Sequence, residues 1–310
     1  HGVQTARMIE GIEKVLMEEQ PDALVIYGDT NSTLAGTVAA SKIHVPIVHI
    51  ESGLRSYKKQ MPEEINRILT DHASTLLFTP TKAGLTNLEK EGFRISEPPY
   101  HIDNPGVFHC GDIMYDNSLH YASVSDERSN ILNELELSPG NFVLGTIHRP
   151  PNTDIPENLA SIFRAMGRIS LEKQVILPLH PRTTHKIKGE GYESVRNVLD
   201  EYPNIRIVPP ASFLDIIALE KHCYLTLTDS GGVQKESFFF QRPCIILRDE
   251  TEWIELVEQG AALLVGSSEE RILTAWEHFN DKGGIPETSQ IFGDGKAAIF
   301  ICKTMLENLG

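Results

Sequence analysis

Short apolar runs alternate with amphipathic, helix-type segments along almost the whole 310-residue chain. Such alternation is typical of βαβ units, in which parallel strands are joined by helices, and it predicts the α/β class. The pattern occurs in two similar halves and predicts two open, doubly wound parallel sheets. We expect strands at residues 23–28, 46–51, 75–80 and 105–112 in the first half, and at 142–148, 174–180, 205–210, 224–230, 244–249 and 262–266 in the second.

The domain boundaries follow from a polar, helical stretch in the middle of the chain. We expect an N-terminal domain over residues 1–115 and a C-terminal domain over residues 116–292. A final helix, within residues 293–310, is expected to pack back toward the N-terminal domain. The chain starts with His1, and its first predicted element is already a helix at residues 5–19, so we expect that a first segment is missing.

Charge and composition exclude several classes of partner. The formal net charge is −15, which argues against binding to nucleic acid or to an anionic membrane surface through bulk electrostatics. The sequence contains no apolar stretch long enough to span a bilayer. The four cysteines form no CxxC pair, and Cys223 and Cys244 lie in or beside apolar runs. We therefore expect free, buried thiols and a cytoplasmic protein.

Polar side chains recur where the predicted strands end. In open parallel sheets, ligands bind beyond the carboxyl ends of the strands. One polar residue at such an end is simply a chain turning toward water, whereas a series in both halves predicts a lined cleft between the two domains. The series consists of Asp29, Glu51, His148, His180, Ser230 and Asp249.

The segment "TDSGGVQKES" (residues 228–237) combines a strand end with a glycine-rich helix start. Gly231 and Gly232 allow a ligand to approach the backbone, and the amides at a helix N-terminus favour a phosphate. Ser230 adds a hydroxyl donor, and Glu236 in the second turn is suited to accept hydrogen bonds from ribose hydroxyls. The alternative is a plain tight turn with a serine near the helix cap.

Three acidic residues surround the loop at residues 51–64. Glu63 and Glu64 follow Pro62 at a helix start, where the helix dipole alone explains acidic residues. Glu51 ends an apolar strand, so we expect it to have either a functional role or an ionic partner. Arg55 and Arg67 are the candidate partners. Asp29, in "YGDTNSTLAG", is either a carboxylate in the cleft or a helix cap.

His148 and Arg149, in "GTIHRPPNTD", lie at a strand end before a proline-rich loop. A single histidine is as readily a hydrogen-bonded structural residue as a catalyst, and both roles stay open. No set of histidines and cysteines has the spacing of a metal site. The sequence also lacks the GxGxxG segment of dinucleotide-binding folds.

These motifs together resemble one enzyme family over nearly the whole chain. The segments "YGDTNSTLAG", "HIESGLRS", "MPEEINR", "GTIHRPPNTD" and "LTDSGGVQKES…CIILRDETEW" have the order and spacing of the non-hydrolysing UDP-N-acetylglucosamine 2-epimerases. The resemblance implies a GT-B fold, with two Rossmann-like domains and the active site between them. It also implies a missing first segment that contributes a loop to the site.

The resemblance assigns roles to particular residues. Asp29, Glu51 and Glu63 correspond to catalytic carboxylates, and His148 corresponds to a catalytic histidine. The UDP-binding positions correspond to Arg149, Ser230, Gly231, Gly232 and Glu236. The sequence departs from many relatives at Pro150-Pro151, where they carry a charged or polar residue.

The implied reaction interconverts UDP-N-acetylglucosamine and UDP-N-acetylmannosamine by eliminating UDP to a 2-acetamidoglucal and adding it back. It needs no nicotinamide or other cofactor. The segment "DETEW" instead resembles the branch that acts on UDP-2,3-diacetamido-2,3-dideoxyglucuronate. A GT-B glycosyltransferase and a non-catalytic UDP-sugar-binding protein are further alternatives. The family also implies a homodimer and control by substrate, neither of which the sequence tests.

Overall fold

The structure is a computed structural model that describes residues 2–179, 181–286 and 290–309. The chain divides into two compact units. The first contains residues 1–116 and 290–310, and the second contains residues 117–289. His180, one of the predicted strand-end residues, lies outside the described residues.

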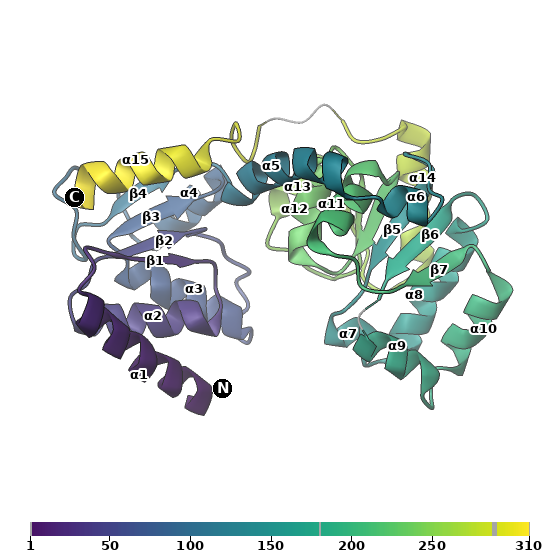
Figure 1. Ribbon diagram of the computed structural model, residues 1–310, viewed down its shortest axis with the longest axis horizontal. Helices are drawn as coiled ribbons and strands as arrows, with labels where there is room; N and C mark the ends of the chain where they lie inside the picture. Colours follow the sequence, from purple (N-terminus) through teal and green to yellow (C-terminus); the bar gives the residue numbers. More distant parts are fainter. Residues whose placement is uncertain (1, 180, 287–289, 310) are drawn as a thin grey trace. The chain divides into compact units, whose positions relative to one another are not determined.

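The first unit is built on a parallel sheet whose strands follow the order of the chain, β1-β2-β3-β4, among the described residues (Figure 1). Strands β2 and β3 are buried at every position, as expected for a parallel sheet that is covered on both faces. The four strands predicted for this half are confirmed with shorter ends. They span Leu24–Tyr27 (β1), Ile47–Ile50 (β2), Leu76–Thr79 (β3) and Gly106–His109 (β4).

The two faces of this sheet pack against different helices because successive side chains of a strand point to opposite sides. Ile47 belongs to a core that includes Leu16 of α1 (Gly2–Glu19) and alanines of α2 (Asn31–Lys42). Val48 belongs to a core that includes Ile301 of α15 (Ala297–Leu309). The first unit also contains α3 (Pro62–Ala73) and α4 (Lys82–Lys90).

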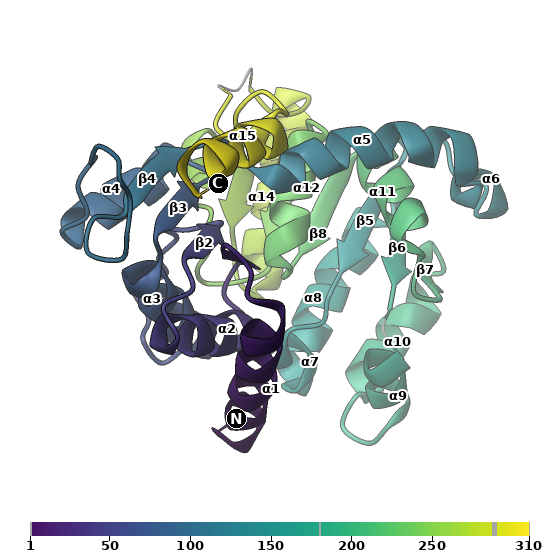
Figure 2. The same cartoon turned by 60° about the vertical axis from the view of Figure 1, so that its left-hand side comes forward.

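The second unit contains a larger parallel sheet with the order β10-β9-β8-β5-β6-β7 among the described residues. The order reverses between β5 and β8, which are direct neighbours with Thr146 opposite Thr228 (Figure 2). This reversal is the topological switch point of a doubly wound fold. The predicted strands are confirmed at Phe142–Thr146 (β5), Gln174–Pro178 (β6), Ile205–Val208 (β7), Leu225–Thr228 (β8), Cys244–Ile246 (β9) and Ala262–Leu264 (β10).

Helices cover both faces of the second sheet, and each face has its own apolar core. One core gathers Val143, Phe163 and Trp276, and the other gathers Phe142, Leu144 and Leu219. Helix α5 spans the boundary between the units. The helices are α5 (Ile113–Arg128), α6 (Ile131–Glu134), α7 (Pro150–Thr153), α8 (Pro156–Ile169), α9 (Pro181–Lys188), α10 (Glu193–Glu201), α11 (Phe213–His222), α12 (Gly231–Phe239), α13 (Ile254–Glu258) and α14 (Glu269–Lys282).

The cysteines match the expectation of free thiols. All four are free, but only Cys223 and Cys244 are buried as expected, whereas Cys110 is half-buried and Cys302 is exposed on α15. Burial raises the pKa of the Cys244 thiol to about 12. Such thiols are packing residues rather than nucleophiles. Among the residues that the structure describes, no helix combines the length and the apolar character that crossing a bilayer requires.

Candidate active site

In the first unit, Asp29 and Glu51 lie at the carboxyl ends of two adjacent strands. The amide of Gly28 donates to the carbonyl of Ile50 at 3.0 Å, which joins the turn after β1 to the end of β2. A Cβ atom added to Gly28 would lie 3.2 Å from Oε2 of Glu51. Because Asp29 follows Gly28 directly, the two predicted carboxylates belong to one small region around this glycine.

Glu51 has an unusual backbone conformation. Its φ is +73°, in the left-handed region that few residues other than glycine adopt. Residues held in such conformations cluster at functional sites, where the surrounding structure imposes them. A glutamate kept at this position is consistent with a carboxylate that is needed in one particular place.

Asp29 is oriented by the start of helix α3. Its Oδ2 accepts a hydrogen bond from Nη2 of the buried Arg67 at 2.7 Å, and its carbonyl accepts from the Asn66 side chain at 2.8 Å. The carboxylate is nevertheless 33% exposed. Asp29 is therefore held in place and still accessible to a ligand.

The structure distinguishes the two glutamates that follow Pro62. Glu64 is buried and accepts hydrogen bonds from the amides of Ser56 and Tyr57, both at 2.9 Å. It anchors the loop that leads into α3. Glu63 is half-buried and lies four residues before Arg67, on the same helix face. Arg67 pairs with Asp29 and also lies 3.4 Å from Oε2 of Glu64, so this arginine contacts Asp29 and Glu64.

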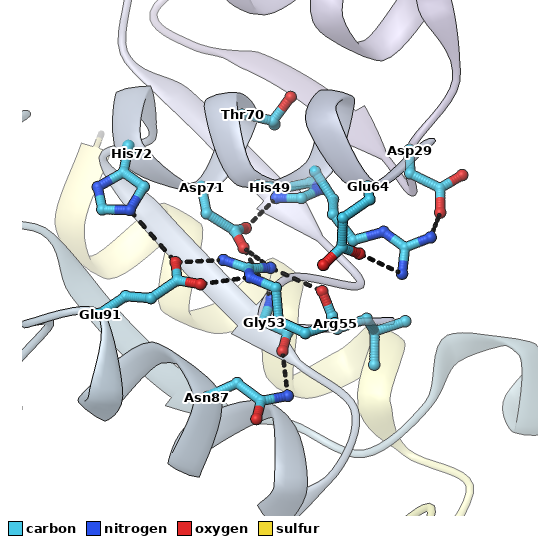
Figure 3. Close-up of polar contacts among 12 residues, drawn as sticks. Asp29, His49, Gly53, Arg55, Glu64, Thr70, Asp71, His72, Asn87 and Glu91 are labelled. Carbon is cyan, nitrogen blue, oxygen red and sulfur yellow. Dashed lines mark hydrogen bonds and ion pairs between the residues drawn. The ribbon is translucent and has the colours of Figure 1, made fainter. Parts of the chain in front are cut away.

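Both arginines proposed as partners of Glu51 form ion pairs with other carboxylates. Arg67 pairs with Asp29, as described above. Arg55 pairs with Asp71 at 2.7 Å and binds Glu91 through two hydrogen bonds of 2.7 Å (Figure 3). In this second group Arg55 and Asp71 are buried, and Glu91 is partly exposed.

Histidine and carboxylate side chains extend this buried group. His49, in the middle of β2, is completely buried and contacts Asp71 at 2.6 Å. Burial alone would raise the pKa of Asp71, but the hydrogen bond and charge of His49 and the charge of Arg55 keep it below its usual value. Neither His49 nor Asp71 was predicted from the sequence. The available signal was a single histidine inside an otherwise apolar strand.

In the second unit, the predicted phosphate-binding residues lie at the switch point. Ser230 directly precedes α12, and Gly231 and Gly232 form its first turn. Ser230 occupies the N-cap position, but its hydroxyl does not cap the helix. The amides of a first helical turn have no intrahelical acceptors, so this turn offers N–H groups and a hydroxyl to an anion.

A buried aspartate joins the loop after β5 to the turn after β8. Asp229 accepts hydrogen bonds of 3.0 Å from the amides of His148 and Arg149, and another of 3.0 Å from the Asn152 side chain. The carboxylate thereby holds the His148 loop beside Ser230. Asp229 lies within the strand predicted at residues 224–230, but its contact with this loop could not be predicted, because its partners lie about 80 residues earlier in the chain.

The His148 ring faces a buried carboxylate with one nitrogen, while its side chain stays accessible. Its Nδ1 lies 3.3 Å from Oδ1 of Asp229, while the side chain is 51% exposed. A carboxylate at Nδ1 favours the tautomer that carries the proton there and leaves Nε2 for a ligand. Pro150 and Pro151 begin the short helix α7, where a missing N–H has no cost, so these prolines fit the loop.

Further charged and aromatic residues surround the start of α12. Glu236 lies in its second turn; burial, and then the charge of Glu236, raise the pKa of Glu220 well above its usual value. A Cβ atom on Gly231 would lie 3.8 Å from Glu252 and 3.9 Å from Nε1 of Trp253. The Lys235 ammonium lies 4.1 Å from the centre of the Trp253 ring. The "DETEW" segment therefore forms one wall of this region.

The described part of the chain contains no group of three histidine, cysteine or carboxylate side chains arranged to hold a metal ion. The two regions present acids, a histidine and the amides of a helix start. The first unit supplies the acids Asp29, Glu51 and Glu63. The second supplies His148, Arg149 and the amides that follow Ser230.

Comparison with known proteins identifies this arrangement. The family model described as UDP-N-acetylglucosamine 2-epimerase matches residues 1–306. A UDP-N-acetylglucosamine 2-epimerase homolog of Methanococcus maripaludis is 43% identical over 100% of this chain and 82% of its own length. A UDP-2,3-diacetamido-2,3-dideoxy-D-glucuronate 2-epimerase of Pseudomonas aeruginosa is 42% identical over 96% of this chain and 78% of its own length.

A solved structure shows the same fold. The UDP-GlcNAc 2-epimerase of Methanocaldococcus jannaschii, in complex with UDP-GlcNAc and UDP, matches with a TM-score of 0.82 and 36% identity. The match covers 99% of this chain and 82% of that protein. The predicted class is therefore confirmed as GT-B-like α/β, with Rossmann-like parallel-sheet units.

Proposed function

The chain belongs to the UDP-N-acetylglucosamine 2-epimerase family, and on that premise we propose that it inverts C2 of a UDP-linked 2-acetamido sugar. The observation that carries this proposal is that Asp29 and Glu51 both lie beside Gly28, at the ends of adjacent strands. Both carboxylates come from strand ends, and Asp29 is fixed by Arg67 while remaining accessible. Two such groups suit a reaction that removes a proton from a carbon atom and returns it.

The proposed reaction has two reversible stages. In the first, the bond between C1 and the UDP oxygen breaks, and UDP leaves with the electron pair. A carboxylate takes the proton from C2, and the electrons of the broken C2–H bond form the C1=C2 double bond of a 2-acetamidoglucal. In the second stage, C2 receives a proton on the opposite face and UDP adds back to C1. A positioned acid or base contributes roughly 10²- to 10⁴-fold to such a proton transfer.

We assign the three acids to these stages as a set. Asp29, Glu51 and Glu63 provide the proton acceptor, the proton donor and the negative charge that stabilises the positive C1 as UDP departs. Preorganised electrostatic groups of this kind contribute on the order of 3 kcal/mol each to transition-state stabilisation.

The second unit provides the groups that bind the leaving UDP. We propose that the diphosphate is bound by the hydroxyl of Ser230 and the amides of Gly231 and Gly232, with His148 and Arg149 contributing further donors. The switch point of a doubly wound sheet is the usual location of a nucleotide, which supports this role. Glu236 is proposed to accept hydrogen bonds from the ribose hydroxyls.

UDP-N-acetylglucosamine is the proposed substrate, with UDP-N-acetylmannosamine as its epimer. A second candidate is UDP-2,3-diacetamido-2,3-dideoxyglucuronate. It is favoured by the identity to the Pseudomonas aeruginosa enzyme and by Trp253, which contacts the α12 start through the "DETEW" segment. We further propose that the protein acts as a cytoplasmic homodimer in polysaccharide biosynthesis.

Positional isotope exchange tests the proposed chemistry. Each candidate substrate is prepared with ¹⁸O in the bridge between C1 and the β-phosphorus and is incubated with the protein. We expect the C2 epimer to form and the label to move into non-bridging positions of the β-phosphate, because UDP leaves C1 and then returns. Epimerisation without movement of the label would contradict elimination. Absence of an epimer from both sugars, together with sugar transfer to an acceptor, would favour a glycosyltransferase.

A further inference from the structure

The loops that carry Asp29 and Glu51 share one buried anchor. His49 lies in β2, directly before Ile50 and Glu51, and Asp71 lies near the end of α3. Both side chains are completely buried and contact each other at 2.6 Å (Figure 3). None of the roles assigned above involves this pair.

His49 uses both of its ring nitrogens. Nε2 lies 2.9 Å from the carbonyl of Gly28, and Nδ1 faces Oδ1 of Asp71. A carbonyl can only accept a hydrogen bond, so Nε2 must carry a proton. Nδ1 shares a second hydrogen bond with Oδ1 of Asp71, so the ring binds both groups at once. The carbonyl belongs to Gly28, the residue that precedes Asp29.

The second carboxylate oxygen of Asp71 binds the loop that follows Glu51. Oδ2 accepts a hydrogen bond from the amide of Gly53 at 3.1 Å and pairs with Arg55 at 2.7 Å. Gly53 has a φ of +79°, and a Cβ atom there would lie only 2.6 Å from the carbonyl oxygen of Gly84. The segment from Glu51 to Gly53 therefore fits closely against α4 and is held from below by Asp71.

A second layer of charges keeps Asp71 and Arg55 in place. The guanidinium of Arg55 also binds both oxygens of Glu91, and Glu91 lies 3.2 Å from Nε2 of His72. The Arg55 side chain is buried, so its two carboxylate partners fix it rather than solvent. Bidentate arginine–carboxylate pairs are among the most directional polar contacts in proteins. Arg55, which Glu91 holds in place, therefore supports the His49–Asp71 pair through its contact with Asp71.

We propose that His49 and Asp71 are positioning residues that set the distance between the carboxylates of Asp29 and Glu51. This inference rests on the proposed function. His49 holds Gly28 and with it Asp29, while Asp71 holds Gly53 and with it the strained turn at Glu51. Acid–base groups lose about 100-fold in rate when they are displaced by about 1 Å, so a shared rigid anchor affects turnover without contacting substrate.

The matched variants His49→Asn and His49→Gln test this proposal. Both replace the imidazole ring with a side-chain amide. An Asn amide reaches the position of Nδ1, whereas a Gln amide reaches the position of Nε2 and can still donate to Gly28. We expect kcat to fall about 10- to 100-fold in His49→Asn and less than about fivefold in His49→Gln. KM and UDP affinity are expected to stay within about threefold of wild type, because His49 contacts neither sugar nor UDP.

Thr70→Val is the control for a general disturbance of this core. Thr70 is buried in α3 beside Asp71, but its hydroxyl contacts Thr37 of α2 at 3.1 Å and neither of the two loops. We expect its kcat to equal that of wild type. Equal kcat values for wild type and His49→Asn would overturn the proposal. If His49→Asn does not fold, a loss of more than tenfold in His49→Gln would overturn it, because that variant retains the required donor.

Amide hydrogen exchange separates this proposal from the proposed function. We expect the peptide covering residues 27–32 to exchange at least about tenfold faster in His49→Asn than in His49→Gln or Thr70→Val. This measurement needs no turnover. A wild-type protein without epimerase activity would refute the proposed function, whereas unchanged exchange at residues 27–32 in His49→Asn would refute the anchoring role of His49.

Discussion

Asp29→Asn and Glu51→Gln are each expected to lower the rate of C2 epimerisation by about 10²- to 10⁴-fold. Each substitution preserves the size of the side chain and removes a carboxylate that is proposed to move a proton or to stabilise charge at C1. UDP affinity is expected to stay within about twofold of wild type, because the residues proposed to bind UDP belong to the second unit. Turnover is measured by NMR of the sugar, and UDP affinity by calorimetry.

Glu10→Gln is the matched control for this prediction. Glu10 is an exposed residue on α1, so its substitution removes one negative charge without touching the strand ends. Its turnover is expected to equal that of wild type. Undiminished turnover in both Asp29→Asn and Glu51→Gln would contradict the assignment of these acids.

Asp71→Ala is expected to lower the free energy of unfolding by about 3–5 kcal/mol, because removing one partner of a buried ion pair leaves charge without compensation. The substitution deprives His49, Arg55 and the Gly53 amide of their common acceptor. It also creates a cavity in a region without solvent. Urea unfolding followed by circular dichroism at pH 7 measures the effect.

Glu18→Ala provides the contrasting control. Glu18 pairs with Lys14 on the exposed side of α1, at 3.9 Å and with both side chains largely in solvent. Exposed pairs contribute about 0–1 kcal/mol, so little change is expected. Similar losses for Asp71→Ala and Glu18→Ala would show that the buried pair is not the stabilising feature described here.

The contribution of Asp71 also depends on pH. The pKa of Asp71 is lowered in the folded protein, so the unfolded chain binds its proton first as the pH falls. The stabilisation is therefore complete above the unfolded value of about 3.9 and is lost as the pH falls through the lower folded value. We expect the unfolding free energy of the wild type to decrease more steeply below about pH 4 than that of Asp71→Ala.

The strands and the class of fold were predictable because each buried strand of a parallel sheet is an apolar run that is separated from the next by a helix. That β5 and β8 are neighbours could not be predicted, because strand order depends on pairing between segments about 80 residues apart. The same long-range pairing lets Asp229 hold the amides of His148 and Arg149. Sequence alone located these residues at strand ends but not their contact.

Two further features depend on packing that no local pattern encodes. Glu63 and Glu64 look equivalent at a helix start, but one position along a helix turns the side chain by about 100°, which buries Glu64 and leaves Glu63 half-exposed. His49 and Asp71 meet only because α3 packs over β2. A lone histidine in an apolar strand indicates a buried partner but does not identify it.

Incorporation of deuterium at C2 tests the central claim most directly. The wild-type protein is incubated in heavy water with UDP-N-acetylglucosamine and, separately, with UDP-2,3-diacetamido-2,3-dideoxyglucuronate, and C2 is observed by NMR. If carboxylates of the first unit exchange the C2 proton while UDP is held by the second, at least one sugar acquires deuterium at C2 in the epimer. A folded protein that binds UDP and leaves the C2 hydrogen of both sugars unexchanged would contradict the account.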